Sequence, residues 1–282
     1  MTTDEFFEPR VWHRLALGVE PIDAVTRHPI GAAVQVGREV ADRRSAHRRP
    51  ADPIDPLRRR SDLPLETSGT TRFKLRHGRT VGDTALIRVD DPCRCYVPRR
   101  FSMPLWTVAD VDIGHIGAWY RLLRPWLSPG PAYPVPGGST GLRGRVMRAG
   151  VAIRWPRIVA VNNAGLVLGR AHGDERGEFL LLLNTVGTAP APPGPTIDLE
   201  LIVRASNRPR DTSAPMPADR IADLPLELVV RSPAPPGQPD LDNPLLRGEV
   251  TPRGYTTSTT RAPMTIRVGR MELTTAPIEF TP

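Results

Sequence analysis

The sequence has very little cysteine. Only Cys93 and Cys95 are present, one residue apart, and so close a spacing rarely allows an unstrained disulfide. No second cysteine pair accompanies them, so a structural zinc site would have to recruit distant histidines. We therefore interpret both as unpaired thiols of a protein kept in a reducing compartment.

Long apolar runs are also absent. No stretch reaches the roughly 20 apolar residues that a membrane helix needs. The first ten residues are acidic and aromatic and lack the apolar core of a signal peptide. We expect no membrane segment and a cytoplasmic protein, or one that belongs to a particle assembled in the cytoplasm.

Familiar catalytic motifs are scarce as well. There is no H-E-x-x-H and no phosphate-binding glycine loop, and the G-x-S-x-G match at residues 137–141 falls in a proline- and glycine-rich segment, so we predict no enzyme, catalytic residue, cofactor or metal. A small-molecule ligand is not indicated. The strongest polar candidate is His172, close to Asp174 and Glu178, which we interpret as a hydrogen-bonded turn, with a ligand site as the alternative.

Positive charge is plentiful, and it is nearly all arginine, since Lys74 is the only lysine in a chain of formal charge +8. Many arginines fall in residues 41–61, a segment without an apolar period that we interpret as an exposed loop. Contact with an acidic protein surface is a second reading. Nucleic-acid binding is the least favoured, because aspartates dilute the run and aromatic residues for base stacking are missing.

Proline and glycine are abundant, at 33 and 24 residues. Proline interrupts helices, and both residues favour turns between short strands. We predict an all-β fold of two or three immunoglobulin- or transthyretin-like sandwich modules, with one short helix and a proline-rich linker.

The first predicted module covers residues 1–127 and includes the arginine-rich loop. Apolar residues alternate with polar ones around Leu17, Val36, Phe73 and Ile87, which is the period of a half-buried strand. Near its end, residues 119–126 place apolar side chains at helical spacing and predict the short helix. Residues 128–139 (SPGPAYPVPGGS) then form the proline-stiffened linker.

The second predicted module covers residues 140–282, with a third module from about residue 220 as an alternative. Its strands are expected near residues 142–146, 153–161, 166–171, 179–183 and 197–203. Further strands are expected near residues 224–230, 245–250, 264–268 and 278–280. Residues 179–183 are continuously apolar and predict a buried central strand.

A tight turn precedes that apolar run. Asp174 can accept backbone hydrogen bonds within the turn, Gly177 can take a positive φ, and Phe179 can enter the core. With the preceding strand Leu142-Arg143-Gly144-Arg145-Val146, this pattern resembles the carboxypeptidase-regulatory-like domain, a transthyretin-like sandwich. His172 departs from that pattern, where a threonine is expected. The resemblance covers residues 141–183 and implies a non-catalytic accessory or adhesion-like module.

The layout of the whole chain is also similar to proteins encoded beside phage-tail-like contractile injection systems, through residues 72–78 (RFKLRHG) and 96–101 (YVPRRF). The resemblance implies a structural or interaction protein whose partners are other protein subunits of an assembly. A carbohydrate- or cell-wall-binding sandwich is the alternative. Because arginine and tryptophan are enriched in binding hot spots, the first surface to test contains Trp119, Arg121, Arg124 and Trp126.

Overall fold

The computed structural model describes residues 15–31, 34–41, 60–78, 81–113, 116–183, 194–207, 221, 223–230 and 243–282. Strands dominate this part of the chain, and its helices are α1 (Val108–Ile113) and the 3-10 turn η2 (Ala118–Arg121). The prediction of an all-β fold is confirmed. No helix within the described ranges is long and apolar enough to cross a membrane. Most of the predicted arginine-rich loop, residues 42–59, lies outside them.

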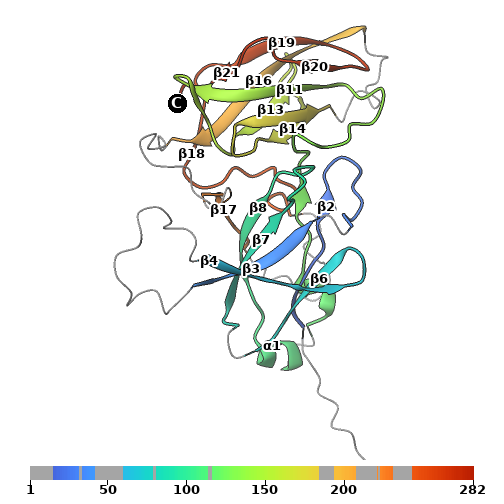
Figure 1. The fold of residues 1–282 in the computed structure, drawn as a ribbon, viewed down its shortest axis with the longest axis vertical. Coiled ribbons are helices and arrows are strands. Elements are labelled where there is room, and N and C mark those ends of the chain that lie inside the picture. The colour runs from blue at the N-terminus through green and yellow to red at the C-terminus, as the bar shows by residue number, and fades with distance from the viewer. Residues whose placement is uncertain are drawn as a thin grey trace, which may run out of the picture.

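Two β units lie one above the other in Figure 1, and we call them the lower and the upper unit. In the lower unit, one sheet has the order β17-β8-β7-β3-β4 and another has the order β5-β6-β1-β9, while β10 pairs with β2. These strands are β1 (Leu15–Val19), β2 (Ile22–Asp23), β3 (Gln35–Ala41), β4 (Arg60–Pro64), β5 (Glu66–Ser68), β6 (Arg72–Arg76), β7 (Thr84–Asp90), β8 (Arg99–Pro104), β9 (Leu122–Leu123), β10 (Trp126–Leu127) and β17 (Leu226–Leu228).

The upper unit has two sheets that enclose one core. The first has the order β12-β11-β15, with β20 and β21 also paired to β11, and the second has the order β14-β13-β16-β18, with β19 paired to β16. These strands are β11 (Gly141–Arg148), β12 (Val151–Ala152), β13 (Arg157–Val161), β14 (Val167–His172), β15 (Glu178–Leu182), β16 (Thr196–Ser206), β18 (Tyr255–Thr257), β19 (Ala262–Arg267), β20 (Met271–Leu273) and β21 (Ile278–Glu279).

Alternation explains the upper core. Along β16, Leu199, Leu201 and Val203 are buried while their neighbours are more exposed, and they pack against Leu142 and Phe179 of the facing sheet. Each strand therefore contributes one apolar face to the same interior, as the period of two requires.

The chain between β16 and β18 leaves the upper unit and returns to it. We call its described residues, 221, 223–230 and 243–254, the crossing segment. Within it, β17 pairs in parallel with β8, and Val229 and Leu246 belong to the core of the lower unit. The described residues after 220 therefore do not make a third module: some complete the lower unit, and β18–β21 complete the upper one.

Part of the crossing segment was predicted with the wrong local structure. Residues 245–250 form no strand, because a turn covers 244–248, with Gly248 at φ +76° and its N–H donating to the Leu245 carbonyl at 2.9 Å. Leu245 and Leu246 are apolar because they pack on the lower core, and not because they belong to a sheet.

The predicted helix at residues 119–126 is also wrong. Helical geometry ends at Arg121, Leu122 is already extended, and β9 and β10 pair in parallel with β1 and β2. The apolar spacing suited a helix, but Pro125 interrupts the segment and the edge of β1 gains backbone partners from an extended chain. The short α-helix lies instead at α1.

The predicted linker, residues 128–139, packs through Tyr133 against β15, the predicted central strand. β15 pairs with β11 alone among the described strands, so it is not central. It is buried on both faces because Phe179 and Leu181 enter the upper core, while Leu180 and Leu182 pack against Tyr133. Tyr133 lies in residues 128–139, so the first part of that segment packs between the units and is not a free linker.

Candidate functional site: a buried junction between the two units

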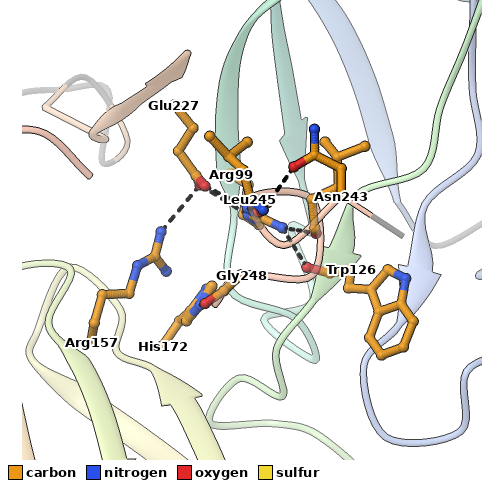
Figure 2. Close-up of polar contacts among 9 residues, drawn as sticks. Arg99, Trp126, Arg157, His172, Glu227, Asn243, Leu245 and Gly248 are labelled. Carbon is orange, nitrogen blue, oxygen red and sulfur yellow. Dashed lines mark hydrogen bonds and ion pairs between the residues drawn. The ribbon is translucent and has the colours of Figure 1, made fainter. Parts of the chain in front are cut away.

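Arg99 is the centre of the contact between the units. It lies on β8, is fully buried, and has all five of its N–H donors paired. Two reach Glu227, at 2.9 Å (Nε) and 2.5 Å (Nη2), and three reach the carbonyls of Trp126, Leu245 and Leu246 at 2.5–2.9 Å. Figure 2 shows this arrangement. A planar guanidinium suits it, because a lysine ammonium has three donors and no fork.

Glu227 joins the two units through a second arginine. It comes from β17, is 3% exposed, and accepts a hydrogen bond at 3.1 Å from Arg157 Nη2 of β13 in the upper unit. Burial lowers the pKa of Arg157, and the neighbouring Glu227 opposes that shift. The three ionised side chains carry a net charge of +1 in the interior (Figure 2). Each loses its hydration there, so their pairing must replace it.

His172 lies beside these charges and stays neutral. It is 2% exposed, and its Nε2 lies 3.2 Å from the Gly248 carbonyl, which identifies Nε2 as the protonated nitrogen. Burial, with the added repulsion of Arg157 and Arg99, holds the pKa of His172 well below its ordinary value of 6.5. A Cβ atom at Gly248 would lie 2.7 Å from the imidazole ring, so the crossing segment approaches His172 as closely as a glycine permits.

Further contacts surround this centre. Arg94 of the lower unit pairs with Glu175 and lies 3.5 Å from Asp174 of the upper one. On the crossing segment, Asp223 accepts from the Trp155 indole N–H at 2.9 Å. We use the term junction for Arg99, Arg157, His172, Glu227 and the residues that contact them. It connects three parts of the chain that are distant in sequence.

A second carboxylate, Asp23 of the lower unit, binds two tyrosines near the junction. Asp23 accepts the phenolic hydroxyls of both Tyr96 and Tyr133 on one oxygen, at 3.1 and 2.8 Å. Burial raises the pKa of both tyrosines above its ordinary value, so both remain hydrogen-bond donors. The two rings meet edge to face, with their centroids 5.6 Å apart. This contact holds the segment after β10 against the lower unit.

The four residues of the predicted interaction surface do not share one environment. Trp119 is 58% exposed. Arg121 donates to the Leu15 carbonyl, and Arg124 pairs with the buried Glu20 at 2.9 Å. The backbone N–H of Trp126 donates to the Leu246 carbonyl. The two arginines and Trp126 thus contribute to internal contacts, and the Trp119 ring is the part most open to solvent.

The turn residues are placed together before β15. Asp174 Oδ1 accepts from the N–H groups of Arg176 and Glu178, at 2.8 and 3.0 Å. Gly177 has φ +75°, and Phe179 is 3% exposed. Asp174 and His172 do not form a common site, because His172 turns to Gly248 while Asp174 serves the turn.

The described residues contain neither a disulfide nor a cluster of metal-ligating side chains. Cys93 and Cys95 are both free, and burial raises the pKa of the Cys95 thiol. No group of three or more histidine, cysteine, aspartate or glutamate side chains gathers there in a way that could hold a metal ion.

Sequence reasoning did not find the junction. In the sequence, Arg99 was noted only as part of residues 96–101, and Glu227 only as part of the predicted strand at residues 224–230. The one available signal was that run, residues 224–230, in which a single glutamate interrupts five apolar side chains and a proline. A charge inside a buried strand needs a partner, but the sequence does not say which of the 38 basic residues supplies it.

Comparisons with known proteins do not assign a family. No protein-family model and no curated protein sequence matches the chain. Among solved structures, it is similar to fervidolysin from Fervidobacterium pennivorans, a keratinolytic enzyme related to subtilisin. The match has a TM-score of 0.23 and 15% identity, over 69% of this chain and 27% of that protein.

Proposed function

We propose that this chain is a non-enzymatic structural and interaction protein, a subunit of a phage-tail-like contractile injection particle. The observation that carries the proposal is the junction. Arg99 has every donor paired, and His172 is committed to Gly248, so two of the most deeply buried polar side chains among the described residues join the two β units. This use of buried charge suits a subunit that keeps a fixed shape within an assembly.

The resemblance of residues 141–183 to the carboxypeptidase-regulatory-like domain supports an accessory sandwich module in the upper unit. Two apposed sheets with a shared core agree with such a module. The segments at residues 72–78 and 96–101 support the particle in particular, through their similarity to proteins encoded with such systems.

Composition of the purified particle tests the proposal. Contractile particles would be isolated from the native cell by density sedimentation and analysed by quantitative mass spectrometry. We expect the chain at a fixed ratio to the sheath and tube subunits. A chain that sediments alone, with no subunit at constant ratio, would contradict the proposal.

Trp119 provides a surface test within that experiment. Trp119→Ala should reduce incorporation into the particle and leave the melting temperature unchanged, because the side chain is 58% exposed. Leu166→Ala in the upper unit is a matched control with 60% exposure. Charge reversal at Arg124 is a poorer test, since it also breaks the ion pair with Glu20.

The carbohydrate-binding alternative needs aromatic rings exposed along one face. Trp155 is 3% exposed and has its indole N–H bound to Asp223. Trp119 is strongly exposed, but it stands apart from Trp155 on the other unit. Nothing in these positions favours a sugar-binding face over a protein contact.

A further inference from the structure

A cleft of about 890 Å³ lies beside the junction, where the crossing segment meets the upper unit. This volume falls in the range of roughly 300–1,000 Å³ that is usual for ligand sites. Its described lining comes from the turn and strand at residues 148–155, from Ser206, from Asp223 and Pro225, and from residues 253–255. Four separate parts of the chain therefore shape it.

Trp155 lines the cleft in a strained conformation. Its φ is +57°, in the left-handed region that bulky residues rarely adopt. Three hydrogen bonds hold it there: its N–H donates to the Asp174 carbonyl at 3.0 Å, its indole to Asp223 at 2.9 Å, and its carbonyl accepts from Tyr255 at 2.8 Å. Strain maintained by the surrounding structure is more frequent at functional sites than elsewhere.

One wall of the cleft is fixed by a two-point ion pair. Arg154 donates to both oxygens of Asp223, at 2.5 and 2.6 Å, and its guanidinium carbon lies 5.5 Å from the Trp155 ring centroid. Asp223 thereby has its charge matched, and it is the only acidic residue among the described lining residues.

Two more arginines line the same cleft. Among the described residues, Arg148 and Arg253 have no side-chain hydrogen-bond or ion-pair partner, whereas most arginines near the junction are paired. Arg148 is half-buried and Arg253 is exposed. Two unpaired guanidinium groups at one cleft create a positive potential that an anion would complement.

We propose that this cleft binds an extended acidic segment of a partner protein, with carboxylates on Arg148 and Arg253. The inference rests on the proposed function, since it names the chemistry of one partner contact. Val151, Ile153 and Pro225 are half-buried and add apolar surface between the charges. A segment that alternates acidic and apolar side chains fits this lining, and recognition of acidic motifs by arginine clusters is a recurrent binding mode.

The lining favours such a segment over other anions. Because Trp155 is 3% exposed and fixed by its hydrogen bonds, its ring is not open for stacking on a sugar or a base. Ala149, Asp223, Arg253 and Gly254 are exposed, so the cleft opens to solvent and an occupant can continue beyond it. A protein segment meets both conditions.

Fluorescence anisotropy with a defined peptide tests the proposal. The probe is a fluorescein-labelled octapeptide that alternates glutamate with leucine, titrated with the full-length protein at physiological salt. We expect Arg148→Gln/Arg253→Gln to weaken its binding about tenfold, which is the loss expected for two charge contacts of modest strength. The melting temperature should not change, because neither arginine pairs with another side chain in the described part of the chain.

A matched variant separates the cleft from the overall charge of +8. Arg27 and Arg270 are exposed, have no side-chain partner among the described residues, and do not line the cleft. Arg27→Gln/Arg270→Gln removes the same two charges and should change the affinity less than about twofold. Equal weakening by the two double variants would overturn the proposal, as would no measurable binding to the wild-type protein.

Two competitors identify the class of ligand. An unlabelled oligothymidylate of eight nucleotides that displaces the probe better than the unlabelled peptide would overturn the proposal in favour of a nucleic acid. Weaker competition by the oligothymidylate and by inorganic phosphate supports it. If the Arg148/Arg253 variant still enters the particle normally, the cleft contact fails while the proposed function stands. If the wild-type chain is absent from the particle, the proposed function itself fails.

Discussion

At the scale of single residues, the chain uses a buried arginine at a position where a hydrophobic contact is the common alternative. Arg99 shows why: five donors in one plane satisfy a carboxylate and three backbone carbonyls at once. Such a residue is costly to bury, and it is equally costly to leave without its partner. The stability of the junction therefore depends on the one carboxylate that the two arginines share.

Replacing Glu227 should be the most damaging conservative change at the junction. Glu227→Gln removes the negative charge and leaves Arg99 and Arg157 buried with unmatched charge. We expect a loss of about 3–5 kcal/mol in the free energy of unfolding, measured by urea denaturation. Glu200→Gln is the control, since Glu200 pairs with Arg261 at the surface, and it should cost less than about 1 kcal/mol. Similar losses for both variants would argue against the junction as a source of stability.

His172 gives the junction a dependence on pH. Its pKa is lowered in the folded state and close to 6.5 in the unfolded state, so above pH 6.5 both states hold it neutral. As the pH falls below 6.5, the unfolded state takes up a proton that the folded state refuses, and stability declines by up to about 1.4 kcal/mol per pH unit.

His172→Gln should remove that decline while keeping a donor for the Gly248 carbonyl. The measurement is the free energy of unfolding of both proteins between pH 7.5 and 5.0. We expect the difference in unfolding free energy between wild type and variant to become smaller as the pH falls. The gap at pH 7.5, where His172 is neutral in both states, reports the lost contacts alone. A constant gap across the range would show that His172 takes up its proton equally in both states.

At the scale of elements, the strands with strict alternation were predictable. β7 and β16 follow from the period of their apolar residues, and the ends of β16 were placed within one to three residues. The helix at residues 119–126 and the strand at 245–250 failed for a shared reason. In both, apolar residues contact the lower unit from segments without a regular period, so spacing alone assigned the wrong structure. Register and partner strand, as for β17 on β8, depend on contacts more than 120 residues away.

The turn at residues 244–248 offers a test at this scale. Gly248→Ala places a methyl group 2.7 Å from the His172 ring at a positive φ. Gly254→Ala has the same backbone cost at φ +80°, with no atom within 4 Å of the added Cβ. We expect about 1 kcal/mol of destabilisation at Gly254 and about 1–3 kcal/mol more at Gly248, measured by urea denaturation. Equal destabilisation by the two substitutions would mean that Gly248 is not in close contact with the His172 ring.

At the scale of the whole molecule, the two units should behave as one folding unit. The crossing segment gives Val229 and Leu246 to the lower core, while the strands on either side of it belong to the upper unit. Calorimetry of the full chain should show one transition whose calorimetric and van't Hoff enthalpies agree. Two separated transitions would contradict this.

Leu246→Ala sharpens that test. It removes about 2–5 kcal/mol of packing from the lower core. If the units are coupled, the single transition moves to a lower temperature as a whole and does not split. Leu273→Ala is the comparison, because Leu273 is 73% exposed and its loss should leave the midpoint nearly unchanged.

The composition of the chain predicted the all-β fold class, whereas contacts between distant residues determine how the strands are arranged. Proline and glycine content excluded long helices, and the apolar period located most strands of the upper unit. The path of the crossing segment could not be predicted from the sequence. No local feature of residues 221–254 distinguishes a strand of the upper unit from a strand that pairs with β8.

The order of β8 and β17 along the chain also affects biosynthesis. A ribosome releases β8 early, but its edge partner and the carboxylate for Arg99 come more than 120 residues later. The lower unit therefore stays unfinished, with a bare strand edge, while most of the upper unit is translated. Nascent chains of this protein should need protection from premature edge pairing during that interval.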